Sequence, residues 1–263
     1  MSATADRIDA ARAEGRAVLV GYLPAGYPSV AGSVEAAKAM VEAGVDVVEL
    51  GLPYSDPVMD GPAIQRAADA ALRAGTRTRD VLAAVEQVAA AGAPVLVMSY
   101  WNPVLRYGVE AFGRDLAAAG GAGLITPDLI PDEAGEWLEV SDRHGLDRVF
   151  LVAPSSTPER LALTARSCRG FVYAASTMGV TGARTSVGAG ASRLVSDVRA
   201  AGADRVCVGL GVSTGEQAAE VAAFADGVIV GSALVQRLTD DGPAGVAELA
   251  AELAAGVRRR VPA

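Results

Sequence analysis

The stretch AVLVGYLPAGYPSVAGSVEAAKAMVEAGVDVVEL (17–50) holds one complete copy of the pattern that decides the fold. Two short apolar runs, AVLVGYL (17–23) and VDVVEL (45–50), flank SVEAAKAMVEAG (33–44), in which apolar residues recur at helical spacing. The runs are continuously apolar rather than alternating, which is typical of parallel strands buried on both faces. This stretch therefore predicts a strand, a helix and a further strand of a parallel sheet.

The same alternation continues along the chain. Segments rich in Ala, Glu and Arg separate the apolar runs, and Ser33 and Pro158 are expected near helix starts while Gly145 is expected at a helix end. Between residues 61 and 91 the pattern indicates two helical pieces, so one connection is longer than the others. The predicted strands are 17–23, 45–50, 94–100, 122–126, 148–153, 171–176, 205–210 and 226–231.

Eight strands that alternate with helices over about 250 residues indicate an α/β protein with a single (β/α)8 barrel of the TIM type. Residues 4–14 predict an extra N-terminal helix that plugs the bottom of the barrel. No linker rich in Gly, Ser or Pro divides the chain, so residues 1–263 are expected to form one domain. A doubly wound sheet uses the same alternation and is the alternative fold.

Composition excludes several classes of protein. The net charge of −8 argues against a nucleic-acid-binding surface, and Arg258 to Arg260 are interpreted as the end of a helix. No apolar run reaches about 18 residues, so no membrane span is expected, and the N-terminus does not resemble a secretory signal. Cys168 and Cys207 lack CxxC spacing, which favours a cytoplasmic protein over a disulfide-rich or zinc-binding one.

In a barrel of this type the active site lies at the C-terminal ends of the strands. Among the residues at those ends, Glu49 is distinctive because it follows Val47 and Val48 in a buried run, where a carboxyl group is paired, desolvated or functional. The other residues at predicted strand ends are Tyr22, Tyr100, Asp128, Tyr173, Gly209 and Gly231.

Glu49 and Asp60 enclose a stiff loop and suggest a division of roles. Burial is expected to raise the pKa of Glu49, so that it both takes and gives a proton near neutral pH, whereas Asp60 in a loop is expected to stay ionised. The alternatives are a salt-bridged strand-end glutamate at position 49, and a turn or helix N-cap residue at position 60, which Gly61 and Pro62 favour.

Glycine-rich segments follow the last three predicted strands: GVTGAR (179–184), GLGVSTGEQ (209–217) and GSALVQRL (231–238), the last of which is expected to open a short helix. Glycine lets backbone N–H groups approach a phosphate closely, and a helix N-terminus adds a favourable dipole. Each glycine alone reads as an ordinary turn, but three such loops at one rim predict a phosphate site.

The only histidine, His144, is expected near a helix C-terminus, which excludes a Ser-His-Asp triad at the rim and a multi-histidine metal site. Asp128 is interpreted as a helix cap, with a loop acid and a ligand contact as alternatives. The predicted chemistry therefore depends on carboxyl groups, tyrosines and backbone amides.

Four motifs together resemble the tryptophan synthase α-subunit family, in order and spacing along nearly the whole chain. Tyr54 and Leu210 stand where other members often carry phenylalanine. The first motif is highly specific, while the glycine loops are weak signals by themselves. The motifs are ELGLPYSDPVMDGP (49–62), STMGVTGAR (176–184), GLGVST (209–214) and GSALV (231–235).

The resemblance implies a lyase that splits indole-3-glycerol phosphate into indole and glyceraldehyde 3-phosphate. It implies that Glu49 is the acid and base, that Asp60 holds the indole N–H, and that Tyr173 lies beside the glutamate. Thr181 would belong to a mobile loop that closes over the substrate. Tyr22, Ile64 and Tyr100 would line the indole pocket, and Gly182, Gly211, Gly231 and Ser232 would hold the phosphate.

The resemblance also implies a partner, a pyridoxal-phosphate-dependent β subunit in an α2β2 complex, which receives indole through a tunnel. Pro53, Asp56 and Asn102 match positions that face this partner, and no cofactor is expected in this chain. The alternatives are another phosphate-binding barrel enzyme such as a sugar-phosphate isomerase or epimerase, a regulatory subunit with little activity of its own, and a stand-alone indole-releasing lyase.

Overall fold

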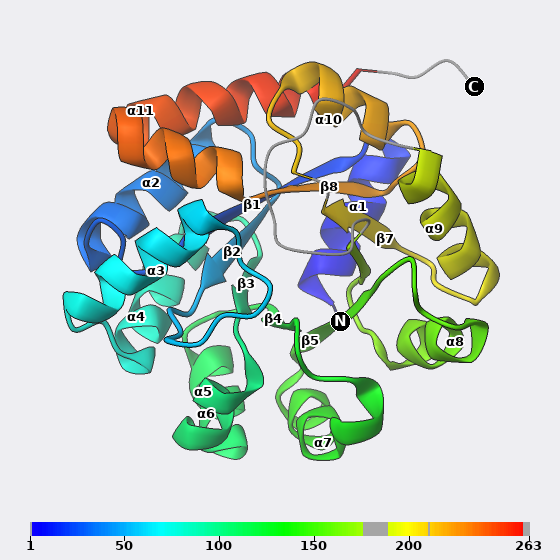
Figure 1. Ribbon diagram of the computed structural model, residues 1–263, viewed down its shortest axis with the longest axis horizontal. Coiled ribbons are helices and arrows are strands. Elements are labelled where there is room, and N and C mark those ends of the chain that lie inside the picture. The colour runs from blue at the N-terminus through cyan, green and yellow to red at the C-terminus, as the bar shows by residue number, and fades with distance from the viewer. Residues whose placement is uncertain (1, 176–188, 210, 260–263) are drawn as a thin grey trace.

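The computed structural model, which describes residues 2–175, 189–209 and 211–259, is a closed barrel of eight parallel strands in chain order (Figure 1). This confirms the predicted (β/α)8 fold, and the alternative of a doubly wound sheet is wrong because β1 pairs with β8. The strands are β1 Val18–Pro24, β2 Val47–Gly51, β3 Val95–Met98, β4 Gly123–Thr126, β5 Asp147–Val152, β6 Val172–Ala175, β7 Val206–Gly209 and β8 Gly227–Val230.

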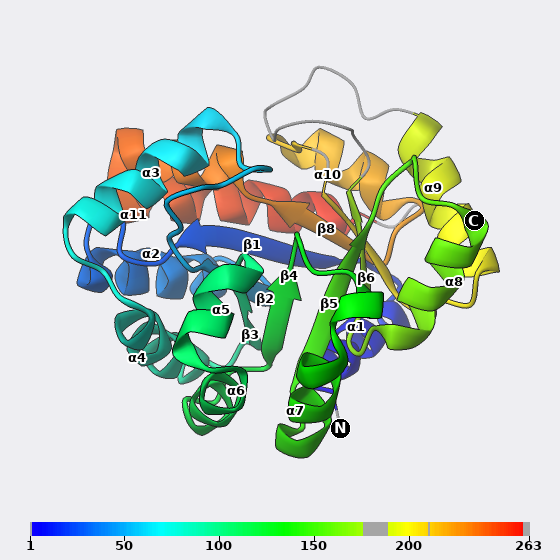
Figure 2. The same cartoon turned by 60° about the horizontal axis from the view of Figure 1, so that its bottom comes forward.

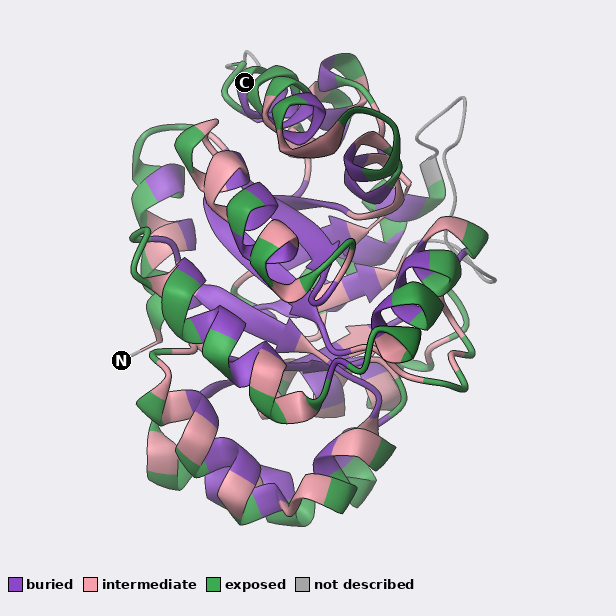
Figure 3. Cartoon of the chain, turned by 90° about the vertical axis from the view of Figure 1, so that its left-hand side faces the viewer, coloured by how far each residue is buried: buried purple, intermediate pink, exposed green. Residues whose placement is uncertain are grey.

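Helices surround the barrel (Figure 2), and their buried faces point toward the strands while their outer faces are exposed (Figure 3). No helix in the described ranges combines the length and the apolar character needed to cross a lipid bilayer. The helices are α1 Ala3–Ala13, α2 Val30–Glu42, α3 Pro62–Arg73, α4 Thr78–Ala89, α5 Trp101–Tyr107, α6 Val109–Ala118, the 3-10 helix η1 Pro131–Glu133, α7 Gly135–His144, α8 Pro158–Ser167, α9 Ala189–Ala200, α10 Gly215–Ala222 and α11 Ser232–Val257.

Three helices differ from expectation. The start of α2 is at Ser29, whose hydroxyl accepts from the N–H of Gly32, and not at Ser33. The helix α5 was not predicted. The helix α11 consists of two helical parts that meet at Gly242, where the backbone is non-helical, just before Pro243; the first part is the short helix expected after β8, and the second part extends the element to Val257. At the other expected boundaries, α8 begins at Pro158 and α7 ends before Gly145.

The interior of the barrel has its own apolar cluster. Side chains alternate between the two faces of a strand, so one residue in two points inward. Ile8 and Ala11 of α1 belong to the same cluster, which confirms that the N-terminal helix plugs the bottom of the barrel. The strand and adjacent residues of this cluster are Val18, Val20, Val47, Leu96, Ile125, Val149, Phe171, Cys207 and Ile229.

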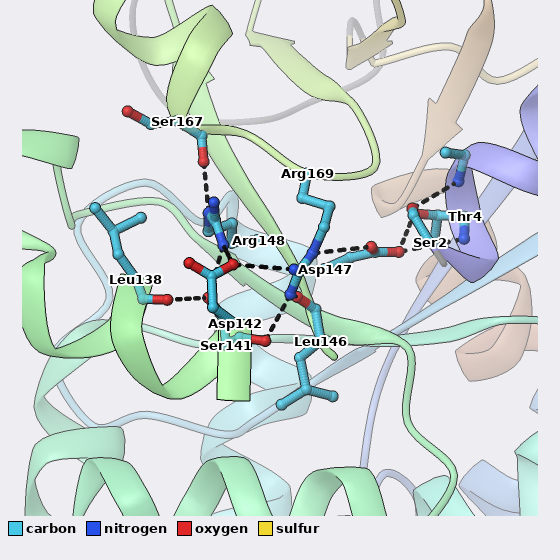
Figure 4. A network of polar contacts seen from close by, with 11 residues as sticks. Ser2, Thr4, Leu138, Ser141, Asp142, Leu146, Asp147, Arg148, Ser167 and Arg169 are labelled. Carbon is cyan, nitrogen blue, oxygen red and sulfur yellow. Dashed lines mark hydrogen bonds and ion pairs between the residues drawn. The ribbon is translucent and has the colours of Figure 1, made fainter. Parts of the chain in front are cut away.

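A buried polar contact fixes the start of α1 to the barrel (Figure 4). One carboxylate oxygen of Asp147, at the start of β5, accepts hydrogen bonds from the backbone N–H of Thr4 (3.2 Å) and from its hydroxyl. Both residues are fully buried. Arg169 lies 3.8 Å from the other oxygen of Asp147. Because Thr4 and Asp147 are buried away from water, the free energy of unfolding is sensitive to the Asp147 carboxylate.

Asp147→Ala is expected to lower the free energy of unfolding by about 2 kcal/mol, because it leaves the N–H and hydroxyl of Thr4 buried without an acceptor. Urea denaturation measures this change. Asp142→Ala is the matched control, since its carboxylate is 58% exposed and its ion pairs with Arg148 and Arg169 are worth about 0–1 kcal/mol each. Equal losses in the two variants would contradict the role given to Asp147.

Candidate active site

The mouth of the barrel is one layer above the apolar cluster of the interior. Tyr22, Glu49 and Tyr173 follow Val20, Val47 and Phe171 of that cluster by two residues each, so strand alternation turns them inward too. Tyr22 and Glu49 are also neighbours across the β1–β2 pair. Met98 on β3, Gly209 on β7 and Gly231 directly after β8 follow the same rule. The C-terminal ends of the strands therefore present phenols, a carboxyl group and glycines to one space.

Glu49 is fully buried near the end of β2. Neither of its carboxyl oxygens has a hydrogen-bond partner within the described part of the chain, so the alternative of a salt-bridged glutamate is not supported there. Burial raises the pKa of Glu49 to about 8. At pH 7 the carboxyl group is therefore mainly protonated, which is the state of a proton donor.

Asp60 is half-buried at the end of the loop after β2. The N-cap of α3 is Gly61 and not Asp60, so the alternative of a helix cap at position 60 is wrong. Burial raises the pKa of Asp60 to about 6, and a hydrogen bond with the Tyr100 side chain acts in the opposite direction. Asp60 is less solvated than expected, yet it remains mainly ionised at pH 7.

The phenols of Tyr22 and Tyr173 are close to both acids. Burial, followed by the charges of Asp60 and Glu49, raises the pKa of Tyr22 well above its usual value. Burial and then the charge of Glu49 do the same for Tyr173. A methyl group at Gly51 would collide with the Tyr22 hydroxyl, and one at Gly209 would collide with that of Tyr173. These two glycines therefore make room for the phenols.

The glycines predicted to hold phosphate lie beside the aromatic part of the site. Gly231 is the N-cap of α11, and Ser232 is the first residue of that helix. A methyl group on Gly231 would lie 3.4 Å from Cδ1 of Tyr22 and 3.7 Å from Cδ1 of Ile64. Gly211, after β7, has a φ of 72°, a conformation that favours glycine. Thr181 and Gly182 lie outside the described residues.

The N-termini of α10 and α11 differ in the side chains available to accept hydrogen bonds from their first backbone N–H groups. Thr214 caps α10, and the N–H of Gly215 donates to a carboxylate oxygen of Glu252 at 2.7 Å. A carboxylate of the protein itself therefore binds the start of α10. In α11 the N-cap is Gly231, which has no side chain to accept a hydrogen bond from the first turn.

Asp128 is a helix cap, although not of the helix that follows it in the chain. Its carboxylate accepts a hydrogen bond from the backbone N–H of Trp101 at 2.9 Å, at the start of α5. His144 is the last residue of α7, as expected, and its Nε2 lies 2.9 Å from a carboxylate oxygen of Glu110. In the described ranges, no group of three or more His, Cys, Asp and Glu side chains is arranged to hold a metal ion.

Of the residues predicted to face a partner, Pro53 and Asp56 lie in the loop after β2, and Asn102 lies in the first turn of α5. Asp56 and Asn102 are exposed, and Pro53 is half-buried. Three large apolar side chains are exposed in the segments that follow β2, β3 and β4. They are Val58, Leu105 and Ile130, with exposed fractions of 71%, 50% and 38%.

Sequence reasoning missed several residues of the site. Leu52, Ser99 and Pro127 follow the C-terminal ends of β2, β3 and β4, and this position was the only signal that could have identified them. A small cavity is lined by these residues together with Tyr22, Asp60, Met98 and Tyr100.

Comparisons with known proteins agree with the geometry. The family model of the tryptophan synthase alpha chain matches residues 8–259. The tryptophan synthase alpha chain of Mycobacterium avium is 65% identical over 97% of this chain and 94% of its own. The alpha chain of Salinispora tropica is 64% identical over the full length of both chains.

A solved structure of Mycobacterium tuberculosis tryptophan synthase superposes with a TM-score of 0.94 at 62% identity, and the alignment covers 98% of each chain. The matched region contains the barrel and both acids. The chain belongs to the tryptophan synthase alpha chain family.

Proposed function

We propose that Glu49 and Asp60 are the two carboxyl groups with which this chain carries out the lyase reaction of its family, the cleavage of indole-3-glycerol phosphate to indole and glyceraldehyde 3-phosphate. The observation that carries the proposal is the placement of the two groups: Glu49 is fully buried with no hydrogen-bond partner in the described residues, whereas the Asp60 carboxylate is hydrogen-bonded to Tyr100. Burial raises the pKa of Glu49 to about 8 and that of Asp60 to about 6. Near neutral pH one group is a proton donor and the other a fixed negative charge.

Glu49 moves the proton in two steps. Its carboxyl group protonates C3 of the indole ring, and the ring becomes an indolenine cation. The carboxylate that results takes the proton from the hydroxyl group on the adjacent glycerol carbon while the bond from that carbon to C3 breaks. The electron pair of that bond returns to the ring and the hydroxyl becomes the aldehyde, so Glu49 is protonated again at the end.

Asp60 stabilises the cation between these steps. Its carboxylate accepts the indole N–H, on which positive charge develops when C3 is protonated. The hydrogen bond with Tyr100 holds the carboxylate in its ionised form. Tyr22, Tyr100 and Ile64 form the wall against which the indole ring packs, and Tyr173 keeps Glu49 away from water.

The phosphate is bound at the start of α11. Backbone N–H groups of the first helical turn have no partner within the helix and attract an anion. Gly231 and Ser232 supply them, Gly211 contributes from the loop after β7, and Gly182 from the loop after β6. The position of Gly231 supports this, because a methyl group added there would touch Tyr22 and Ile64, and the phosphate and the indole ring are parts of one substrate. Thr181 belongs to the loop proposed to close over the site.

An assay of indole release tests the function. The purified chain is expected to cleave indole-3-glycerol phosphate slowly alone and faster with a β subunit. Hydrogen bonds to a charged group are worth about 1.5–3 kcal/mol each. Dephosphorylated indole-glycerol loses at least two such bonds to the phosphate, so its kcat/KM is expected to be about a hundredfold or more lower than that of indole-3-glycerol phosphate. Absence of indole release with either preparation would refute the proposal, and equal rates for both substrates would refute the phosphate site.

The partner is a β subunit in an α2β2 complex. Val58, Leu105 and Ile130 are exposed apolar side chains in the segments that follow β2, β3 and β4. Pro53 and Asp56 lie in the same loop as Val58, and Asn102 lies on α5 with Leu105. An exposed apolar group bordered by polar residues is typical of a protein interface. Chains of this family need no cofactor of their own, so pyridoxal phosphate belongs to the β chain.

The cytoplasm is the proposed compartment, which the free thiols of Cys168 and Cys207 support. An isomerase or epimerase would not need a fixed charge at Asp60 beside an indole ring. A regulatory subunit and a stand-alone lyase are distinguished from the proposed enzyme by the assay, since the first would release little indole and the second would not respond to a β subunit.

A further inference from the structure

A pair of tyrosines connects the exposed side of the loop after β2 with Asp60. Tyr54 lies in this loop and is half-buried, and Tyr100 is the buried N-cap residue of α5. Their ring centroids are 5.2 Å apart and their planes are tilted by 32°, a spacing at which aromatic rings attract one another. The two loops of neighbouring strands are therefore held together by this ring contact.

Tyr54 also has a contact on its outer side. The side-chain amide of Asn102, which is exposed on α5, donates a hydrogen bond to the Tyr54 hydroxyl at 3.4 Å. This distance is at the long end of the range for hydrogen bonds, so the contact is weak and responds to small movements of either loop. A group that binds to Asn102 from outside would therefore displace the Tyr54 hydroxyl or strengthen its hydrogen bond.

Tyr100 has its contacts on the inner side of the pair. Its hydroxyl accepts a hydrogen bond from the backbone N–H of Met59 at 2.9 Å and forms a hydrogen bond with the carboxylate of Asp60. Tyr100 thus fixes two consecutive residues of the loop. The position of the Asp60 carboxylate depends on the Tyr100 ring, and the Tyr100 ring is braced by Tyr54.

We propose that Tyr54 is a positioning residue for the lyase reaction, which braces Tyr100 against Asp60 through its ring and links Asp60 to the partner face through the hydrogen bond from Asn102. The inference rests on the proposed function, because it assigns a role in placing the charge of Asp60. It adds a residue that is not among those proposed to line the indole pocket or to hold the phosphate, and that acts through its ring contact with Tyr100. It also predicts how a bound β subunit affects the position of Asp60, namely through a polar contact with the side-chain amide of Asn102.

Removal of the Tyr54 ring tests the brace. Tyr54→Ala is expected to lower kcat about tenfold, and to move the acid limb of the pH profile to higher pH because Tyr100 no longer holds Asp60 in its ionised form. The titratable groups that feel the charge of Asp60 are Tyr22 on β1, Tyr100 after β3 and Tyr173 on β6, and the charge of Glu49 on β2 acts on Tyr22 and Tyr173. Tyr54→Phe keeps the ring and is expected to restore the wild-type acid limb.

Removal of the Tyr54 hydroxyl tests the link to the partner. At β-subunit concentrations that saturate each variant, the measured quantity is the ratio of indole release with the β subunit to release without it. Tyr54→Phe and Asn102→Ala are each expected to lower this ratio about fivefold. The double variant is expected to be no worse than either single variant, because both changes break the same hydrogen bond.

Tyr107→Phe is the matched control. The Tyr107 hydroxyl, at the end of α5, donates to Asp115 at 2.7 Å, far from the Tyr54–Tyr100 pair along the helix. This variant loses the same atom and is expected to keep the wild-type ratio. A wild-type ratio for Tyr54→Phe, or additive losses in the double variant, would overturn the link. An unshifted acid limb in Tyr54→Ala would overturn the brace, whereas an inactive wild-type chain would instead refute the proposed function.

Discussion

Replacement of Glu49 with glutamine is expected to lower kcat for indole release by about a thousandfold or more. A general acid or a general base typically raises the rate by a factor of about 10²–10⁴, and Glu49 is proposed to serve as both. Glutamine has nearly the shape of the protonated carboxyl group, but it neither gives a proton to C3 nor takes one from the hydroxyl group. The measurement is indole release at saturating substrate, with and without the β subunit.

The fold is expected to survive this change. Glu49 is fully buried and its carboxyl oxygens have no partner in the described ranges, so glutamine removes no hydrogen bond seen there. Circular dichroism and thermal unfolding of Glu49→Gln check this. Glu42→Gln is the control, since it makes the same chemical change at an exposed position of α2 and is expected to keep wild-type activity. Full activity of Glu49→Gln would show that Glu49 is only a buried strand residue.

The pH dependence of the wild-type chain follows from the same group. In the proposed mechanism Glu49 acts first as an acid, so activity is expected to require its protonated form and to fall as the pH rises through its pKa of about 8. The basic limb of the pH profile is therefore assigned to Glu49. The small residual activity of Glu49→Gln is expected to lack this limb, because glutamine does not titrate.

The site residues that lie on strands could be predicted from the sequence, because two regular patterns, one along the chain and one within each strand, determine where they lie. The alternation of apolar runs with helices gave eight strands, and alternation within a strand fixes the direction of each side chain. Once Val47 was known to be buried in a strand, Glu49 had to point to the same side. Burial of a carboxyl group then raises its pKa, whatever the details of packing.

The loop-borne part could not be predicted in the same way. The helix α5 has Pro103 in its first turn, where the N–H is not needed, and proline in a short segment also indicates a turn. The cap of α5 comes from Asp128, 27 residues away, so no local signal marks it. The contact between Tyr54 and Tyr100 likewise joins two loops that only the closed barrel brings together.

For Asp60 the sequence left a turn and a catalytic role equally open. The structure decides against a helix cap, because Gly61 is the N-cap of α3 and the Asp60 carboxylate is hydrogen-bonded to Tyr100 instead. The degree of burial was also unexpected. A loop residue was expected to be well solvated, but the aromatic wall beside Asp60 removes enough water to raise its pKa.

Replacement of Asp60 with asparagine is expected to lower kcat by about 10²–10³, the usual effect of removing one group that stabilises charge in a transition state. Asparagine still accepts a hydrogen bond from the indole N–H, but it has no negative charge to oppose the positive charge on the ring. The measurement is kcat for indole release, with Asp69→Asn as the control, because Asp69 is exposed on α3 and pairs only with Arg73 in the described structure.

The pH profile separates the charge of Asp60 from a merely structural effect. In the proposed mechanism Asp60 acts in its ionised form, so activity of the wild-type chain is expected to fall as the pH drops through its pKa of about 6. The substrate phosphate also titrates near pH ~6, but it is common to both proteins, so a difference between their acid limbs belongs to residue 60. Asp60→Asn is expected to lose that part of the limb. If the variant instead keeps both the wild-type rate and the wild-type limb, Asp60 only shapes the turn into α3, and the indolenine cation is stabilised by another group.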